Sequence, residues 1–154
     1  MLRKAKIADA KGIYRLISFW AKKNKVLERP LNYIYENIRD FWICTQNRRI
    51  IGSCALHVIG WEDLAEIKSL VVDKRKHKKG IGKELVEACV KEAKSLGVKN
   101  IFVLTFVETF FRHLGFKKLS KNKLPHKIWS DCINCVYFPN CKEESLILNI
   151  GGRR

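Results

Sequence analysis

The feature that most constrains the fold of this chain is a change of hydrophobic period within residues 66–96. Four apolar residues of strand type, Ile67, Leu70, Val71 and Val72, begin this stretch, and a basic loop follows at 74–79. After Gly80 and Gly82, apolar side chains recur at helical spacing as far as Leu96. The sequence therefore predicts a strand, a glycine-containing turn and a helix in immediate succession.

Such a turn is suited to binding phosphate groups. The first N–H groups of a helix have no acceptor within the helix and lie at the positive end of its dipole. Glycine lets the main chain come close to a ligand because no Cβ stands in the way. Basic side chains surround the same turn, namely Lys76, His77, Lys78, Lys79 and Lys83. We therefore expect a ligand that carries several phosphates.

The spacing of the glycines excludes two familiar phosphate motifs. His77 stands where a P-loop has its first glycine, and Glu84 stands where it has Ser or Thr. Leu85 occupies the third glycine position of a dinucleotide fingerprint. The segment 77–82, which reads HKKGIG, instead resembles the pyrophosphate loop Gln/Arg-x-x-Gly-x-Gly/Ala of the GNAT superfamily of N-acetyltransferases. The resemblance implies binding of acetyl-CoA, with His77 in place of the usual Gln or Arg.

Composition narrows the class of protein further. With 154 residues, 47% of them hydrophobic, the chain is long enough for one domain with a packed core. The net charge of +16 comes mostly from lysines spread along the chain, which we interpret as a solvated surface and not as a nucleic-acid interface. We find no membrane-spanning run and no signal-peptide pattern, and so we expect a cytoplasmic protein without a membrane partner. A nucleic-acid-binding module that uses residues 74–79 is the alternative from another class.

Periodicity predicts the remaining elements. A strand at 2–7 precedes a helix that Asp9 would cap, with a core stripe of Ile13, Leu16, Ile17 and Trp20. A second helix is expected to start near Pro30. The other predicted elements are a hairpin of 41–45 and 50–58, strands at 65–72, 100–106 and 145–150, helices at 82–96 and 108–114, and a short strand after Gly115.

This order of elements resembles the GNAT fold over residues 2–150. The resemblance implies an α/β (α+β) fold with a central mixed, mostly antiparallel sheet flanked by helices. We predict a single domain at 1–150, with a cysteine-containing insertion at 124–144 before the last strand and a tail at 151–154.

The strand before the glycine turn carries the candidate catalytic group. Glu66 lies fourteen residues before Gly80, the spacing at which histone-acetylating GNAT members have their general-base glutamate. The resemblance implies that Glu66 removes a proton from the acceptor amine, and a purely structural carboxylate is the alternative. It also implies an oxyanion donor at the backbone N–H near Leu70 or Val71, and pairing of the pantetheine arm with Leu70 and Val72. Phe111 stands where many members have a proton-donating Tyr, and it cannot donate a proton.

Three further segments narrow the acceptor. Residues 54–58, 61–73 and 124–141 resemble the short, single-domain N-acetylglutamate synthases, the amino-acid N-acetyltransferases of arginine biosynthesis. The resemblance implies direct transfer of the acetyl group from acetyl-CoA to the α-amino group of L-glutamate. Another amine, namely a protein N-terminus, a lysine or a polyamine, is the alternative acceptor. Because L-glutamate is a dicarboxylate, cationic partners are expected, and the candidates are Lys68, Arg39 and Lys127.

The cysteines fall into two groups. Cys44, Cys54 and Cys89 stand alone on predicted elements and are interpreted as small core residues. A second group, Cys132, Cys135 and Cys141 with His126, has the donor types of a structural zinc site. Free thiols or a disulfide are the competing interpretations, and we do not favour zinc. A homodimer is a possible assembly.

Overall fold

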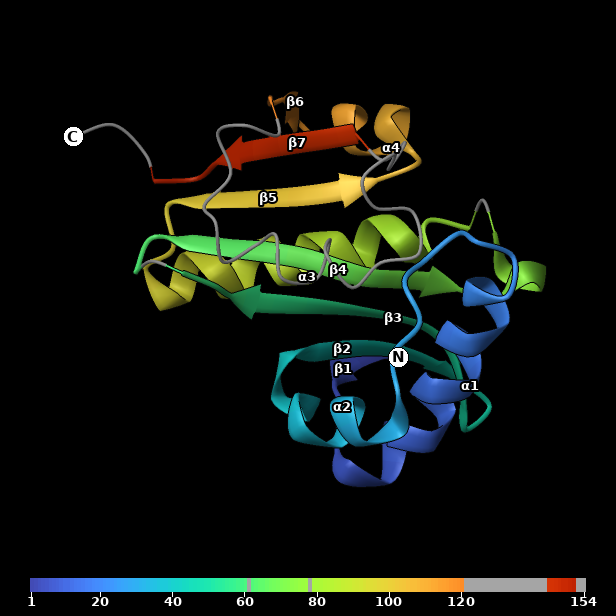
Figure 1. Cartoon of the computed structure of the whole chain (residues 1–154). Helices are drawn as coiled ribbons and strands as arrows, with labels where there is room; N and C mark the ends of the chain where they lie inside the picture. The colour runs from blue at the N-terminus through green and yellow to red at the C-terminus, as the bar shows by residue number, and fades with distance from the viewer. Residues whose placement is uncertain (61, 78, 121–143, 152–154) are drawn as a thin grey trace. The chain divides into compact units, whose positions relative to one another are not determined.

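The computed structural model describes residues 1–60, 62–77, 79–120 and 144–151. Its strands form a mixed, 7-stranded sheet in the order β1-β2-β3-β4-β5-β7-β6, and helices flank it (Figure 1). The pairs β1–β2, β2–β3, β5–β7 and β6–β7 are antiparallel. The predicted fold class is confirmed.

The elements follow the predicted order, with small changes at their ends. The strands are β1 (Leu2–Lys4), β2 (Phe41–Gln46), β3 (Arg49–Val58), β4 (Leu64–Val72), β5 (Asn100–Thr105), β6 (Lys117–Lys118) and β7 (Glu144–Asn149). The α-helices are α1 (Ala10–Ala21), α2 (Leu31–Glu36), α3 (Ile81–Leu96) and α4 (Glu108–His113). Short 3-10 helices are η1 (Ile7–Asp9), η2 (Ile38–Asp40) and η3 (Lys74–Lys76).

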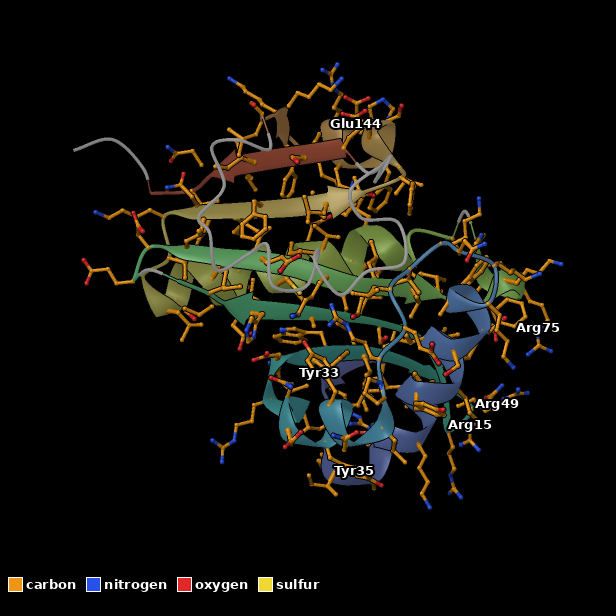
Figure 2. The ribbon with its side chains drawn as sticks, viewed as in Figure 1. Arg15, Tyr33, Tyr35, Arg49, Arg75 and Glu144 are labelled. Carbon is orange, nitrogen blue, oxygen red and sulfur yellow. The ribbon has the colours of Figure 1, made fainter. Side chains whose placement is uncertain are left out.

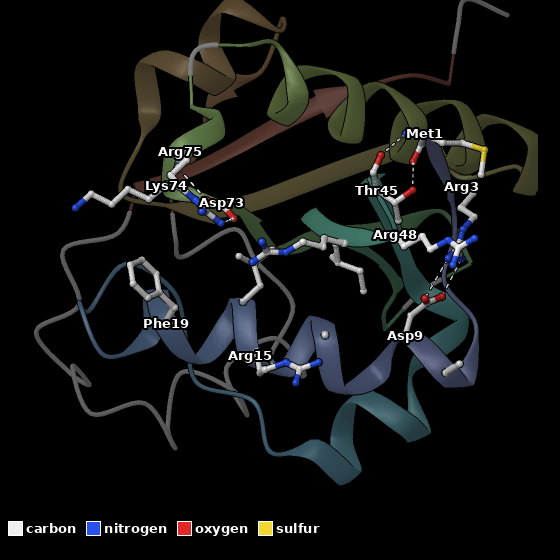
Figure 3. A pocket seen from close by; sticks show the side chains of 15 residues that line it. Met1, Arg3, Asp9, Arg15, Phe19, Thr45, Arg48, Asp73, Lys74 and Arg75 are labelled. Atoms are coloured by element: carbon white, nitrogen blue, oxygen red, sulfur yellow. Dashed lines mark hydrogen bonds and ion pairs between the residues drawn. The ribbon is translucent and has the colours of Figure 1, made fainter.

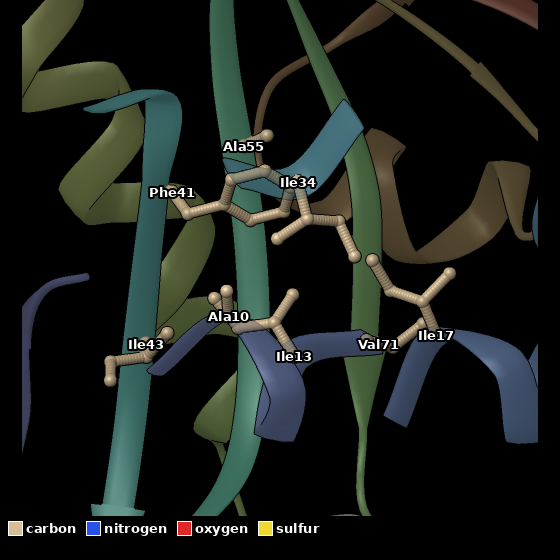
Figure 4. Packing of buried hydrophobic residues seen from close by; sticks show 8 residues of the cluster. All are labelled: Ala10, Ile13, Ile17, Ile34, Phe41, Ile43, Ala55 and Val71. Atoms are coloured by element: carbon tan, nitrogen blue, oxygen red, sulfur yellow. The ribbon is translucent and has the colours of Figure 1, made fainter. Parts of the chain in front are cut away.

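The chain divides into two compact units. One consists of Met1–Leu56 with Ile67–Lys91, and the other of His57–Glu66 with Glu92–Arg154. In the first unit, apolar side chains of α1 and α2 pack against β2, β3 and β4 (Figure 4). The buried members of this cluster are Ala10, Ile13, Ile17, Ile34, Phe41, Ile43, Ala55 and Val71. The predicted stripe of the first helix thus faces a core, with Ile13 and Ile17 fully buried.

The other face of β3 packs against α3. A Cβ added at Gly52 would lie 3.0 Å from both Ile81 Cγ2 and Leu85 Cδ1, so the missing side chain lets the helix approach the strand. Two residues further along, the Sγ atoms of Cys54 and Cys89 lie 3.7 Å apart. The hydrogen bond between the two thiols and burial both raise the pKa of the Cys54 thiol. Cys44, Cys54 and Cys89 are all buried free thiols, as their interpretation as core residues predicted.

In the second unit, β5 pairs with β7 along its whole length, from Asn100–Asn149 to Thr105–Glu144. Phe102 and Leu64 form a small buried cluster there. Phe111 of α4 is 2% exposed, and its ring meets that of Phe116 edge-on at 5.3 Å. Among the described helices, none has the length and apolar character needed to cross a membrane.

The prediction that Asp9 caps the first helix is wrong in its detail. Asp9 occupies the N-cap position of α1, but its side chain makes no capping hydrogen bond there. Its carboxylate instead accepts from the Lys6 backbone N–H at 2.7 Å and pairs with Arg3 at 2.8 Å. The hydrogen bond from Arg3 is the main reason why the pKa of Asp9 is lowered. The predicted first strand also ends early, at Lys4, and the chain enters η1 at Ile7.

We predict that Gly52→Ala destabilises the protein by about 1–3 kcal/mol, because the new methyl group overpacks the contact with α3. Urea unfolding measures the change. In a double-mutant cycle with Leu85→Val, which removes the Cδ1 atom in the way, the combined cost should be smaller than the sum of the two single costs. If the two single costs simply added, the proposed overpacking between residue 52 and Leu85 would be wrong.

Candidate functional site

The candidate site begins on β4, whose backbone is irregular near its centre. Ser69 has a φ of +56°, in the left-handed region that a non-glycine residue in a strand rarely adopts. The local backbone therefore departs from regular pleating between Lys68 and Leu70. Glu66 lies three residues before this point and is 7% exposed. This irregularity falls where the sequence predicted an exposed backbone donor.

The carboxyl end of β4 is fixed by two ring nitrogens. Trp20 Nε1 of α1 donates a hydrogen bond to the Val72 carbonyl oxygen at 2.9 Å, and His77 Nε2 lies 3.0 Å from the same oxygen. The two rings are stacked, with centroids 5.1 Å apart and planes inclined by 14°. Because a carbonyl oxygen can only accept, His77 must carry its proton on Nε2. The His77 imidazole thus connects the basic loop to the carboxyl end of β4.

A compact turn at Asp73 follows. The Asp73 N–H donates to the Ile51 carbonyl at 2.7 Å, and the Asp73 side chain accepts from the Arg75 N–H at 2.9 Å. The Arg75 guanidinium also pairs with this carboxylate at 3.3 Å. The hydrogen bond from the Arg75 side chain is the main cause of the lowered pKa of Asp73. The ionised carboxylate therefore stabilises the start of the loop at neutral pH.

The amino end of α3 presents backbone donors. Gly80 has a φ of +79°, and its carbonyl accepts the first helical hydrogen bond, from the Glu84 N–H at 3.0 Å. The N–H groups of Ile81, Gly82 and Lys83 come before that bond, so they have no acceptor within the helix. Lys79 and Lys83 are exposed beside them. These donors fit an anion such as a pyrophosphate.

A second cationic arrangement lies next to β4. The Arg29 guanidinium carbon lies 4.7 Å from the centroid of the Tyr33 ring, and the Lys68 Nζ lies 5.3 Å from it. Arg29 is 7% exposed, whereas an arginine is usually solvated. The Tyr33 hydroxyl is buried and finds no hydrogen-bond partner within the described part of the chain. Figure 2 labels Tyr33 on α2. Three chain segments thus converge on one polar cluster, Arg29, Tyr33 and Lys68.

The structure brings only some of the predicted substrate residues together. Lys68 belongs to the cluster, but Arg39 lies in η2 with an exposed side chain, and its backbone carbonyl accepts from Lys4. Lys78, Lys127, His126 and the cysteines Cys132, Cys135 and Cys141 lie outside the described residues. Within the described ranges, no group of three or more His, Cys, Asp or Glu side chains could hold a metal ion.

Sequence reasoning missed three contributors, Arg29, Tyr33 and Trp20. Arg29 precedes a helix-starting proline, where a charged residue normally indicates solvent exposure. Trp20 was interpreted only as a core residue, although a buried indole N–H usually finds an acceptor and could have indicated a contact. Nothing in the local sequence indicates that Tyr33 would lie between two cations.

Comparison with known proteins shows the family of this chain. The family model of the acetyltransferase (GNAT) domain matches residues 37–118. The chain is 38% identical over 146 residues to an uncharacterized N-acetyltransferase, CT2212, of Chlorobaculum tepidum, covering 95% of this chain and 94% of that protein. It is 31% identical over 134 residues to the amino-acid acetyltransferase of Mycobacterium tuberculosis, covering 85% of this chain and 76% of that protein.

One solved structure shows the same fold. It is the N-acetylglutamate synthase from Neisseria gonorrhoeae complexed with coenzyme A and N-acetyl-glutamate, with a TM-score of 0.90 and 23% identity. The alignment covers 99% of this chain and 35% of that chain. The present chain belongs to the GNAT acetyltransferase family. Within it, the protein is an acetyl-CoA-dependent N-acetyltransferase, as the glycine turn predicted.

We predict that Gly80→Ala weakens binding of coenzyme A, because an L-residue at this φ costs about 1–2 kcal/mol and shifts the donors of α3. Gly97→Ala is the matched control, since Gly97 follows the other end of α3 with a φ of +88°, and a Cβ at either glycine meets nothing within 4 Å. Both variants should lose similar stability in thermal unfolding. Only Gly80→Ala should lose affinity in calorimetric titration, and an equal loss in both would contradict the assignment.

Proposed function

We propose that this protein transfers the acetyl group of acetyl-CoA to the α-amino group of L-glutamate. The observation that carries the proposal is the cluster of Arg29, Tyr33 and Lys68, in which Lys68 is two residues from Glu66 on β4. The cluster supplies cations for a carboxylate ligand, and we assign Glu66 of the same strand as the base. The name of the Mycobacterium tuberculosis relative, an amino-acid acetyltransferase, supports the same substrate class.

The charges of the cluster favour a dicarboxylate. Two cationic groups lie against one ring, so a ligand with two carboxylates offers one carboxylate to each of them. The planar fork of Arg29 suits bidentate binding of a carboxylate, and the Tyr33 hydroxyl can donate a further hydrogen bond. A polyamine or a lysine side chain would bring more positive charge to the same place. The cluster therefore supports glutamate over the cationic alternatives.

The reaction needs a neutral amine. Its nitrogen attacks the thioester carbon, the C–N bond forms, and the C–S bond breaks to release the thiol of coenzyme A. We assign Glu66 to accept the amine proton, directly or through water. The irregular backbone at Ser69 supports an oxyanion donor at the N–H of Leu70 or Val71. Phe111 is buried and has no proton to give, so the thiolate takes its proton from water or another group.

The cosubstrate contacts are part of the same proposal. We assign the phosphates of acetyl-CoA to the backbone N–H groups of Gly80, Ile81, Gly82 and Lys83, with Lys79 nearby and His77 holding the loop. Val71 contributes only backbone, because its side chain belongs to the core cluster with α1 and α2. The Val72 carbonyl already accepts from Trp20 and His77, so pairing with the pantetheine arm is proposed at Leu70. The first step of arginine biosynthesis in the cytoplasm is the proposed setting.

An assay of thiol release from acetyl-CoA tests the acceptor. The panel is L-glutamate, L-glutamine, L-aspartate, L-lysine, spermidine and a peptide, and L-glutamate should give the highest kcat/KM. In Arg29→Lys and Lys68→Met, the KM for L-glutamate should rise at least about tenfold, because each loses a charge-assisted contact with a carboxylate. The KM for acetyl-CoA should stay within about twofold of wild type, since the predicted changes are confined to the acceptor site.

The same assay identifies the outcomes that oppose the proposal. Turnover with spermidine or the peptide, and none with L-glutamate, would contradict the assignment of L-glutamate as the acceptor. The assignment of the protein as an acetyltransferase would still hold. Arg39→Gln serves as the matched charge control, because Arg39 is exposed in η2. If this variant raised the KM for L-glutamate as much as Lys68→Met does, the cluster would not be the binding site.

We predict that Glu66→Gln lowers kcat with L-glutamate by about 10²–10⁴-fold, the usual contribution of a general base. Glutamine has almost the same shape, so calorimetric affinity for coenzyme A should not change. Glu62→Gln is the control, because Glu62 is exposed in the loop before β4. If the Glu66→Gln enzyme had wild-type kcat, the Glu66 carboxylate would have a structural role and would not be the base.

A further inference from the structure

A cavity of about 1130 Å³ lies in the first unit, beside α1, the β2–β3 hairpin and η3 (Figure 3). Its lining includes none of residues 77–83, and none of Glu66, Arg29, Tyr33 or Lys68. The cavity therefore shares no group with the acceptor cluster or with the backbone donors of α3. Its volume is large enough for a ligand of several functional groups.

The cavity is rich in arginine, in contrast to the rest of the chain. The sequence holds ten arginines and 21 lysines. Five of those arginines line the cavity and only one lysine does, namely Arg3, Arg15, Arg48, Arg49, Arg75 and Lys74. A generally lysine-rich, solvated surface does not account for this excess of arginine over lysine in the cavity. Arginine is the residue whose planar fork binds phosphate in a bidentate way.

Most of these cations are not neutralised. The cavity has two carboxylates, of which Asp9 pairs with Arg3 at 2.8 Å and Asp73 with Arg75 at 3.3 Å. Arg15, Arg48, Arg49 and Lys74 form no ion pair with a described carboxylate. Four positive charges therefore remain around one cavity, and Figure 3 shows Arg15 on α1 and Lys74 on η3 at its border.

The backbone fixes the positions from which these side chains project. Asn47 and Arg48 have φ values of +51° and +64°, so the β2–β3 hairpin closes through a tight two-residue turn. On the facing helix, a Cβ at Gly12 would lie 2.7 Å from Ile50 Cδ1, which shows how closely α1 approaches β3. The cations of the helix and the hairpin are thus held near each other. The two carboxylates of the cavity offset only part of this repulsion, and a multivalent anion would remove the rest.

We propose that this cavity binds the polyphosphate group of a small molecule, such as a nucleoside triphosphate. Four unpaired cations, three of them arginines, match a chain of phosphates better than a single anion. Leu16 and the partly exposed Phe19 line the same cavity and offer apolar surface for the remainder of the ligand. The proposed ligand is a free nucleotide, and the experiment distinguishes it from the nucleotide end of coenzyme A.

The test is calorimetric titration of ATP and of inorganic tripolyphosphate into the whole protein, at about 0.15 M salt, where weak surface attraction is largely screened. Coenzyme A is present at saturation, so that the backbone donors of α3 are occupied. The variant Arg15→Gln/Arg49→Gln removes two exposed charges of the cavity. Lys91→Gln/Lys94→Gln removes two exposed charges of α3 and is the matched control.

The proposal expects ATP and tripolyphosphate to bind the wild type in the presence of coenzyme A. It expects at least a tenfold loss in the arginine variant, less than a twofold loss in the lysine variant, and unchanged affinity of both for coenzyme A. Abolition of ATP binding by coenzyme A, or equal losses in the two variants, would overturn it. A loss of coenzyme A affinity in the arginine variant would also overturn it, by assigning the cavity to the cosubstrate itself.

Discussion

The hydrogen bonds to the Val72 carbonyl oxygen are the contacts on which the site most depends. Trp20 reaches this oxygen from α1 and His77 from the basic loop, and the two rings stack on each other. A helix, a strand end and a loop are thus fixed to one atom. Because α3 begins only four residues after His77, the direction of its first N–H groups depends on that attachment. The unusual histidine of the loop therefore has a structural role that a glutamine or arginine would perform differently.

The parts of the fold that depend on local pattern were predictable. The change of period at the glycines predicted β4, the loop and α3 within one residue at each end, because strand and helix spacing differ and glycine marks the change. Asp9 shows the limit of local reasoning. Its position before a helix suggested a cap, yet its carboxylate accepts hydrogen bonds from Arg3 and from the Lys6 N–H and not from the first N–H groups of α1. A capping rule considers only the backbone that follows the residue, and so it misses partners that precede it.

The candidate site divides in the same way. The proposed phosphate-binding half uses backbone donors at the start of a helix, and these depend on consecutive residues that a sequence displays directly. The proposed acceptor half consists of Arg29, Tyr33 and Lys68, which come from a loop, a helix and a strand. Only Lys68 had a positional argument, since it shares a strand with Glu66. Arg29 is buried and lies against the ring of Tyr33 on α2, and no spacing in the sequence indicates this contact.

The net charge of +16 was interpreted as a solvated surface, and the structure separates it into parts with different consequences. Under the proposed function, both substrates and both products are anions, so long-range attraction speeds arrival but also slows release. Exposed lysines suit this requirement, because their attraction is screened by salt and does not depend on exact geometry. Arg29 differs, since a desolvated guanidinium binds only a carboxylate that reaches it. Under the proposed function, selectivity for the acceptor therefore depends mainly on Arg29, the one buried cation among the described residues. The much larger exposed charge affects mainly the rate of encounter.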